Sequence, residues 1–322
     1  MSKPIIVTGA AGFIGRNSVG ELNRRGYANL ILVDKLGTDE KWKNLRGLQF
    51  EDLISPDALL ANVLNEHLSD CQSIIHLGAC SATTERDADY LLENNYRYTR
   101  RLCEFSLRHA IRFIYASSAA TYGDGSLGYS DEDAATKTLK PLNMYGYSKH
   151  MFDLWALGSG ALKQIVGLKY FNVFGPFEDH KGDMKSVVAK AYREIQDTGK
   201  VRLFRSANPD YADGEQMRDF VYVKDAVGVT LSFLEHPKAS GLFNCGSGKA
   251  RTWRDLATAV FRALGRPVNI EYIEMPQALQ GKYQYFTEAK MEKLRAAVDT
   301  LPFSSLEDAV KDYVETHLSR LD

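Results

Sequence analysis

A short apolar segment that leads directly into a glycine-rich turn is the feature that most constrains the fold of this chain. Ile5–Thr8 is followed by the turn GAAGFIG, with glycines at Gly9, Gly12 and Gly15, and then by a predicted helix over Asn17–Arg25. Glycine has no Cβ to keep a phosphate away, and a helix N-terminus offers unpaired N–H groups to an anion. This order of strand, turn and helix predicts that the diphosphate of a dinucleotide binds at the turn.

Short apolar segments alternate with helical patterns through much of the chain. The predicted strands are Ile5–Thr8, Leu30–Val33, Ser73–Leu77, Phe113–Ser117, Ile165–Phe174 and Phe220–Val223, and the last is followed by a predicted helix over Lys224–Leu234. Short, fully apolar strands separated by helices are typical of a parallel sheet that is covered on both faces. The sequence therefore predicts the α/β class, with a doubly wound parallel sheet of the Rossmann type.

A smaller second lobe is predicted from two separated pieces of the chain. The chain has 322 residues, whereas single cores stop growing at roughly 250 to 300 residues. Helices are predicted near Met184–Thr198 and Trp253–Leu264, and a run over Val268–Ile273 that is rich in strand-forming residues follows. We assign 1–172 and 217–246 to a dinucleotide-binding domain, and 173–216 and 247–322 to a smaller α/β substrate-binding domain. This assignment leaves open whether the final helix returns to the first domain.

Charge and composition argue against several classes of protein. Lys and Arg (40) nearly balance Asp and Glu (41), which argues against nucleic acid as the main partner. No apolar run approaches the roughly 20 residues that cross a bilayer, so no membrane association is expected. The cysteines Cys71, Cys80, Cys103 and Cys245 lack metal-ligand spacing, and the chain begins with a strand rather than an export signal. We expect a cytoplasmic protein with buried free thiols and no metal site.

The second predicted strand ends at Asp34, where a carboxylate can accept hydrogen bonds from a ribose. A carboxylate repels a 2′-phosphate and favours NAD, but Lys35 and Lys41 are close enough in sequence to pair with such a phosphate. We therefore expect NADP, with NAD as the alternative; a solvated basic loop would give the same pattern. By position, Asp52 and Leu53 are expected at the adenine, and Leu77, Gly78 and Ala79 beneath the diphosphate.

A tyrosine and a lysine one helical turn apart, Tyr145 and Lys149, form the predicted catalytic pair. A neighbouring ammonium stabilises a phenolate and brings the pKa of the tyrosine toward neutral pH, and the same lysine can hold a nicotinamide ribose. Such pairs also arise by chance on helix surfaces. Here the pair follows a strand end that carries Ser118, at the edge of the sheet where open α/β folds bind ligands. Together the three residues predict hydride transfer.

The motifs TGxxGxxG and YxxxK, present as Thr8–Gly15 and Tyr145–Lys149, resemble those of the extended short-chain dehydrogenase/reductase family over nearly the whole chain. The resemblance implies an enzyme that acts on a nucleotide-activated sugar. Ala119 and Ala120 follow Ser118 where the dehydratases of this family carry an acidic pair, which argues against that branch. The segments HLGACSATTE, ENNY, KYFNVFGP, HKGDM and RDFVYV are similar to the branch that inverts C6 of an ADP-linked heptose for lipopolysaccharide.

The resemblance implies transient oxidation of C6 to a ketone by bound NADP and return of hydride to the opposite face. Tyr145 and Lys181 would act as paired bases, Lys149 would tune Tyr145, and Ser118 would orient the hydroxyl. From the residues alone, Lys181 is better explained as a loop lysine that contacts phosphate. Residues expected at the cofactor, from position or from the resemblance, are Gly9, Gly12, Phe13, Ile14, Gly15, Asp34, Lys35, Lys41, Asp52, Leu53, Leu77, Gly78, Ala79, Ser81, Asn94, Tyr145, Lys149, Val173 and Lys181. Residues expected at the substrate are Ser118, Asn172, Asp183, Lys190, Phe204, Arg205, Ser206, Arg218 and Tyr283.

Other functions stay open on the sequence. Asp183 stands where the resemblance leads us to expect a small hydroxyl residue, which is a departure from the family pattern near the sugar. The same fold also serves UDP-hexose 4-epimerases and nucleotide-sugar reductases. A non-catalytic NADP-sensing protein is a further alternative, but it would not need a base beside the nicotinamide. Enzymes of this kind usually self-associate, so we expect a homo-oligomer.

Overall fold

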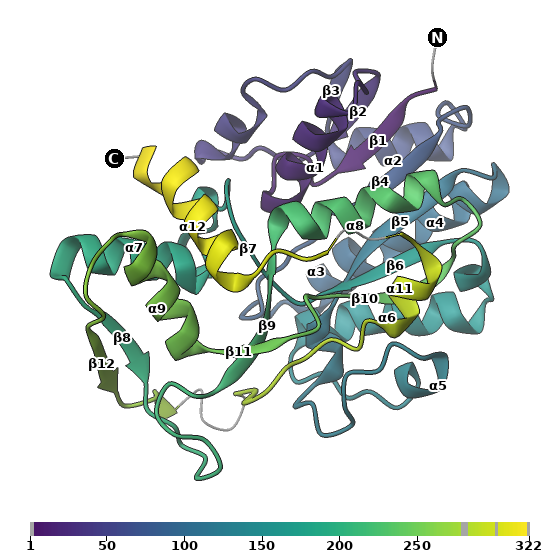
Figure 1. Cartoon of the computed structure of the whole chain (residues 1–322). Coiled ribbons are helices and arrows are strands. Elements are labelled where there is room, and N and C mark those ends of the chain that lie inside the picture. The colour runs from purple at the N-terminus through teal and green to yellow at the C-terminus, as the bar shows by residue number, and fades with distance from the viewer. Residues whose placement is uncertain (1–2, 278–282, 300–301, 321–322) are drawn as a thin grey trace.

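Seven parallel strands form the central sheet of the computed structural model, which describes residues 3–277, 283–299 and 302–320 (Figure 1). Their order across the sheet is β3-β2-β1-β4-β5-β6-β10. The strands are β1 (Ile5–Thr8), β2 (Leu30–Val33), β3 (Asp52–Ile54), β4 (Ser73–His76), β5 (Arg112–Ser118), β6 (Val166–Tyr170) and β10 (Gly241–Cys245). Every residue of β1, β4 and β6 is buried, as strands covered on both faces require. The predicted doubly wound parallel sheet is confirmed.

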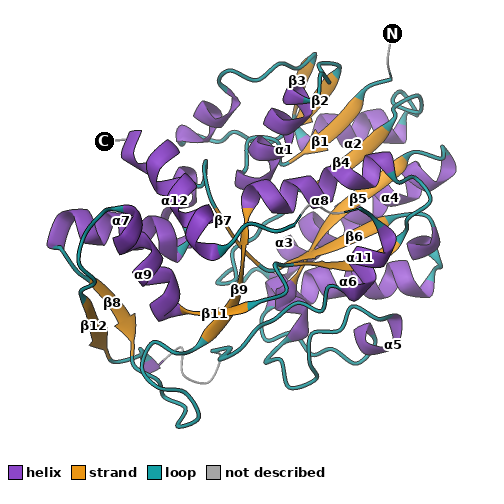
Figure 2. Cartoon of the chain, viewed as in Figure 1, coloured by secondary structure: helices purple, strands orange, loops and turns teal. Residues whose placement is uncertain are grey.

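Helices cover both faces of this sheet (Figure 2). One face packs against α2 (Pro56–Leu64), α4 (Tyr98–Arg108) and α6 (Met144–Gly158), and the other against α1 (Phe13–Arg24), α8 (Val223–Glu235) and α11 (Glu292–Ala297). The short helices α3 (Ala88–Leu91) and α5 (Asp133–Thr136) lie beside α6, and a wider π-helical turn over Leu92–Arg97 joins α3 to α4. Within the described ranges, no helix has both the length and the apolar character needed to cross a membrane.

A smaller lobe lies beside the central sheet (Figure 1). It contains a three-stranded sheet in the order β11-β9-β7 and a two-stranded sheet of β12 and β8. Its elements are β7 (Asn172–Phe174), α7 (Val187–Thr198), β8 (Val201–Phe204), β9 (Met217–Tyr222), β11 (Ala250–Thr252), α9 (Trp253–Ala263), β12 (Ile270–Ile273) and α12 (Leu306–Thr316). Buried apolar residues join α7, α9 and α12, including Ile195, Val260 and Val310. The final helix, α12, packs against α9 and β9 of this lobe.

The predicted strand Ile165–Phe174 is two strands in two different sheets. β6 ends at Tyr170 in the central sheet, and β7 begins at Asn172 in the smaller one. Between them the N–H of Val173 donates to the carbonyl oxygen of Phe171 (2.9 Å), which closes a three-residue turn and redirects the chain. Apolar periodicity reports burial and not the sheet that a strand joins, so the sequence could not separate the two.

The strand predicted over Phe220–Val223 also differs from expectation. β9 is not a later strand of the central sheet, because it pairs in parallel with β7 and antiparallel with β11. The following α8 and β10 do pack on and extend the central sheet. The predicted division of the chain placed β9 in the dinucleotide-binding domain. Its partner strands β7 and β11, however, lie mostly in the residues assigned to the substrate-binding domain.

Candidate active site

A cleft of about 550 Å³ lies at the carboxyl ends of the central strands, where open α/β sheets bind ligands. Its walls come from the ends of β1, β2, β4 and β5, from α6, and from the segment that follows β7. Among the predicted site residues, those that line it are Gly9, Gly12, Phe13, Ile14, Gly15, Asp34, Lys41, Leu77, Gly78, Ala79, Ser81, Ser118, Tyr145, Lys149, Val173 and Lys181. The fold thus brings segments that are far apart in the sequence, from Gly9 to Lys181, together around one cleft.

The glycine-rich turn is so tight that added side chains would meet backbone. A Cβ on Gly15 would lie 2.0 Å from the carbonyl oxygen of Gly9, and one on Gly9 would lie 2.7 Å from the amide nitrogen of Gly78. Gly9 also has φ of +67°, in the left-handed region that favours glycine. No side chain caps α1 at Gly12, which keeps the N–H groups of its first turn available to an anion. The turn fits the diphosphate of a dinucleotide.

Asp34, at the end of β2, is held from two sides. Its Oδ2 accepts a hydrogen bond from the N–H of Ala11 (2.8 Å), and its Oδ1 accepts one from Nζ of Lys41 (2.6 Å). The two side chains are 6% and 21% exposed, so the pair is screened from solvent. Lys35, by contrast, is exposed and is not part of the cleft lining. Carboxylate and ammonium therefore stand together at the expected position of the adenosine ribose.

Tyr145 and Lys149 reach the cleft from the first two turns of α6. Nζ of Lys149 donates to the carbonyl oxygen of Ala116 (2.9 Å), and burial lowers the pKa of this lysine to about 8. Burial raises the pKa of Tyr145, and a hydrogen bond with the Ser118 side chain opposes that rise. In this arrangement the hydrogen bond with Ser118 favours the phenolate of Tyr145, while the ammonium of Lys149 donates to the main chain of β5.

Lys181 enters the same cleft from the segment after β7. Its Nζ lies 5.1 Å from the centre of the Phe13 ring. Burial lowers the pKa of Lys181, while the nearby Glu178 raises it. Glu178 is fully buried and accepts hydrogen bonds from the N–H of Ser186 (2.6 Å) and from Oη of Tyr313 (3.0 Å). This carboxylate ties the loop that carries Lys181 to the start of α7 and to α12.

Three further residues expected at the cofactor are not part of the cleft lining. Asp52 and Leu53 belong to β3, the edge strand of the central sheet. Asn94 donates to Oδ1 of its neighbour Asn95 (2.9 Å). Asn95 is fully buried, and its amide both accepts from the N–H of Cys80 and donates to the carbonyl oxygen of Cys80, at 2.9 Å each. Asn95, which sequence reasoning missed, therefore supports the cleft wall; only the structure separates it from the adjacent asparagine.

Most residues expected at the substrate lie outside this lining, and Arg218 is the most deeply placed of them. The structure puts Asn172, Asp183, Lys190, Phe204, Arg205, Ser206, Arg218 and Tyr283 beyond the residues that line the cleft. The guanidinium carbon of Arg218 lies 4.9 Å from the ring centre of Tyr283 and 5.6 Å from that of Trp253. Nε1 of Trp253 donates to Oη of Tyr283 (2.7 Å). Two aromatic rings thus hold a buried cation, and this burial lowers the pKa of Arg218.

The remaining substrate candidates have local partners. Nζ of Lys190 donates to the carbonyl oxygen of Asp183 (2.7 Å). Arg205, which follows β8, pairs with Asp213 (3.5 Å). Asn172 is exposed at the turn into β7. Asn172 and Arg205 therefore lie on the smaller lobe. Lys190 contacts the loop that carries Lys181.

A buried histidine, His76 at the end of β4, supports the glycine-rich turn. Nδ1 of His76 lies 2.7 Å from Oγ1 of Thr8, and its Nε2 lies 2.8 Å from Oγ1 of Thr99. Thr99 donates to the carbonyl oxygen of Asn95, so it accepts from His76, and the proton is assigned to Nε2. Thr8 therefore donates to Nδ1 of His76, and its Oγ1 accepts from the N–H of Gly78 (3.0 Å). Burial lowers the pKa of His76 to about 3, which keeps the ring neutral.

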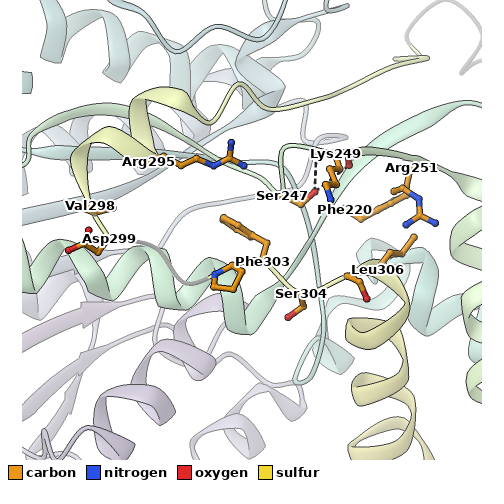
Figure 3. Close-up of a pocket in the computed structure, with 12 residues that line it drawn as sticks. Phe220, Ser247, Lys249, Arg251, Arg295, Val298, Asp299, Phe303, Ser304 and Leu306 are labelled. Atoms are coloured by element: carbon orange, nitrogen blue, oxygen red, sulfur yellow. Dashed lines mark hydrogen bonds between the residues drawn. The ribbon is translucent and has the colours of Figure 1, made fainter.

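A second cavity, of about 670 Å³, lies between β9, β11 and the start of α12 (Figure 3). Its lining includes Phe220, Lys249, Arg251, Arg295 and Phe303. It contains none of the predicted catalytic, cofactor or substrate residues.

In the part of the chain that the structure describes, no group of His, Cys, Asp and Glu side chains is arranged to hold a metal ion. The cleft at the glycine-rich turn is therefore the candidate active site.

Comparison with known proteins agrees with this geometry. Residues 5–246 match the model of the NAD dependent epimerase/dehydratase family. The chain belongs to this family. The ADP-L-glycero-D-manno-heptose-6-epimerase of Nitratidesulfovibrio vulgaris strain DP4 is 58% identical over 318 residues, which cover 98% of each chain. The enzyme of that name from Fusobacterium nucleatum is 48% identical, with 99% of each chain covered.

Solved structures of the epimerase/dehydratase family share the fold. The crystal structure of Helicobacter pylori ADP-L-glycero-D-manno-heptose-6-epimerase superposes with a TM-score of 0.82 at 28% identity, covering 98% of this chain and 96% of that one. Full-length similarity to proteins of this name confirms the resemblance predicted from the sequence segments.

Proposed function

We propose that this member of the epimerase/dehydratase family inverts C6 of the heptose in ADP-D-glycero-D-manno-heptose, giving ADP-L-glycero-D-manno-heptose. The observation that carries the proposal is one cleft that joins the glycine-rich turn to Tyr145, Ser118 and a second, partly buried lysine, Lys181. A simple reductase needs one acid–base group, whereas an epimerase must handle the hydroxyl proton of two epimers. Relatives at 58% and 48% identity that carry the name of this activity support the same conclusion.

NADP is the cofactor that we propose, with NAD as the alternative. The glycine-rich turn would hold the diphosphate, since it leads into the N-terminus of α1, where no side chain caps the first N–H groups. Lys41 neutralises Asp34 at 2.6 Å, which weakens the repulsion between that carboxylate and a 2′-phosphate and places an ammonium beside it. The chemistry that a bound nicotinamide supplies is reversible two-electron oxidation of a carbinol carbon.

Tyr145 and Lys181 would move the hydroxyl proton, each serving one epimer. The phenolate oxygen of Tyr145 would take the proton of the C6 hydroxyl while C6 gives up a hydride, which a bound nicotinamide would accept, and becomes a ketone carbon. Rotation about the bond from this exocyclic carbon to the ring then exposes its other face. Return of the hydride to that face, together with a proton from the Lys181 ammonium to the ketone oxygen, would give the inverted carbinol. Burial lowers the pKa of Lys181, which makes its ammonium a better proton donor in this direction and supplies more neutral amine as the base for the reverse reaction. Ser118 would hydrogen-bond the same oxygen and orient it.

The ADP part of the substrate is proposed to extend toward the smaller lobe. Arg218 is the cation that we assign to the diphosphate, because it is already buried and is held between Tyr283 and Trp253. A cation that is ordered before binding loses little conformational freedom when the ligand arrives. Asn172, Asp183, Lys190 and Phe204–Ser206 complete the proposed contacts to the sugar and nucleotide.

Chromatographic separation of the two C6 epimers after incubation with ADP-D-glycero-D-manno-heptose tests this function. Tyr145→Phe combined with Lys181→Met should abolish inversion and leave the bound dinucleotide in place, because the glycine-rich turn is unchanged. Tyr147→Phe is the matched control: this tyrosine lies on the same helix with 48% of its surface exposed, and its loss should leave turnover normal. Mass spectrometry of the cofactor released by denaturation identifies NADP or NAD.

Two results would count against the proposal in different ways. Near-normal inversion by the Tyr145→Phe/Lys181→Met protein would contradict the paired bases while leaving the reaction itself intact. Failure of the unmodified protein to invert C6 with its cofactor bound would contradict the function as a whole.

A further inference from the structure

A fully buried ion pair lies directly behind the proposed catalytic residues. Asp153 is on α6, one turn beyond Lys149 and two turns beyond Tyr145, and Lys169 is on β6. Neither charged side chain has exposed surface, and Nζ of Lys169 lies 2.9 Å from Oδ2 of Asp153. An apolar pair of similar volume often stabilises a core at least as well as a buried ion pair does. Fold stability alone is therefore a weak explanation for these charges.

The carboxylate of Asp153 links α6 to the strand that ends at the active site. It accepts hydrogen bonds from Oη of Tyr115 (2.9 Å) and from Oγ of Ser117 (2.7 Å), both in β5. Ser117 lines the cleft and is the register partner of Lys169 in the neighbouring strand. With the lysine included, three donors from the two strands β5 and β6 meet one carboxylate of α6, so its position is set by groups on both strands.

The ammonium of Lys169 extends the same network to Ser118. It donates to Oγ1 of Thr121 (2.6 Å), and Thr121 in turn donates to the carbonyl oxygen of Ser118 (2.8 Å). Its Nζ also lies 5.0 Å from the centre of the Tyr122 ring. Two hydrogen bonds thus lead from the ion pair to the backbone of the serine whose side chain contacts Tyr145.

Lys149 lies within the electrostatic reach of this pair. Burial is the main cause that lowers its pKa to about 8, and Asp153 and Cys80 raise it. The other titratable groups that face it are Tyr145 on its own helix and His76 from β4, which burial keeps neutral. Asp153 is therefore the acidic side chain behind Lys149, and Lys169 is the cation that balances it.

We infer that Asp153 and Lys169 are positioning residues of the active site, which fix Ser118 through Thr121 and set the charge behind Lys149. This inference deepens the proposed function and rests on it for the catalytic use of Ser118 and Lys149. Neither residue of the pair touches the space of the cleft, so the pair acts through its neighbours.

The pKa of Lys149 is the most direct readout, and it needs neither substrate nor cofactor. NMR of the full-length protein with isotopically labelled lysine measures it, and the signal lost in Lys149→Arg identifies the residue. Lys169→Met leaves the carboxylate of Asp153 unbalanced, so we expect the pKa of Lys149 to rise by about 1 unit. Lys169→Met combined with Asp153→Asn removes both charges, so the pKa should fall below that of the unmodified protein.

Opposite shifts of the Lys149 pKa in the single and the double variant would separate an electrostatic role of the pair from a packing role. Damaged packing would not change the direction of the shift with the sign of the charge removed. Lys169→Arg keeps the cation and should return the pKa of Lys149 close to its original value. Tyr115→Phe, which removes a neutral hydrogen bond to Asp153, is a second control and should cause a smaller shift than Lys169→Met.

Shifts in the same direction, or no shift in either protein, would overturn the inference. Should Lys169→Met fail to fold, the double variant, which buries no unpaired charge, decides the matter: a pKa that does not fall overturns the inference. In turnover assays, the pH at half-maximal inversion should move in the same direction as the pKa of Lys149. Absence of turnover in the unmodified protein would refute the proposed function but would leave the NMR result intact.

Discussion

Gly15→Ala tests whether the glycine-rich turn is as tightly built as its distances indicate. Alanine is favoured over glycine inside a helix by about 1 kcal/mol, so helix propensity alone predicts a gain in stability. The added Cβ, however, would lie 2.0 Å from the carbonyl oxygen and 2.7 Å from the carbonyl carbon of Gly9. These are backbone atoms and cannot rotate away. Overpacking costs about 1–3 kcal/mol, and contacts this short should give a net loss of unfolding free energy of about 2 kcal/mol.

Gly20→Ala on the same helix is the matched control. Its Cβ would meet Nη1 of Arg16 at 2.7 Å, and this atom is the far end of a flexible side chain that can move. The gain in helix propensity should therefore survive, with stabilisation of up to about 1 kcal/mol.

Thermal unfolding of the two variants measures the difference. A gap of about 3 kcal/mol corresponds to a difference in Tm of about 4 °C for a chain of this length. Titration with NADP should show affinity reduced at least about ten-fold in Gly15→Ala, the equivalent of about 1.4 kcal/mol, and unchanged in Gly20→Ala. If Gly15→Ala is as stable as Gly20→Ala and binds the dinucleotide equally well, the reasoning about the turn is refuted.

Further predictions concern the cofactor, pH and thiol chemistry. Lys41→Ala should reduce the affinity for NADP relative to NAD, because the ammonium beside Asp34 is lost; an unchanged ratio of the two dissociation constants would contradict the phosphate role. Stability should fall as the pH falls from 6.5 to about 3, by up to about 1.4 kcal/mol per pH unit, since the unfolded chain binds a proton at His76 that the folded chain excludes. Urea denaturation of His76→Gln at several pH values should show a shallower dependence, and an equal slope would exclude this histidine as the cause. Among the four cysteines, Cys80 should react fastest with iodoacetamide at neutral pH, because burial raises the pKa of the other three thiols and Cys80 lines the cleft. Mass spectrometry of labelled peptides should also show protection of Cys80 by the dinucleotide, and labelling that the dinucleotide does not slow would place Cys80 outside its site.

Local sequence was sufficient for the parts of the site that depend on neighbours in the chain. Ile5–Gly15 predicted a strand, a tight turn and a helix, and the structure builds all three there. Tyr145 and Lys149 share a helical face because their spacing alone requires it. The alternation of apolar strands with helices determined the doubly wound parallel sheet for the same reason: each signal lies within a few residues.

Tertiary structure decided which of these local pieces meet. No periodic pattern showed that the chain changes sheet at Phe171, that Asn95 rather than Asn94 holds Cys80, or that Lys169 neutralises Asp153. Such contacts join residues far apart in the chain, and they follow from how helices and strands pack to exclude water and satisfy buried polar groups. Local sequence determined the elements and their chemistry, whereas packing determined the partners.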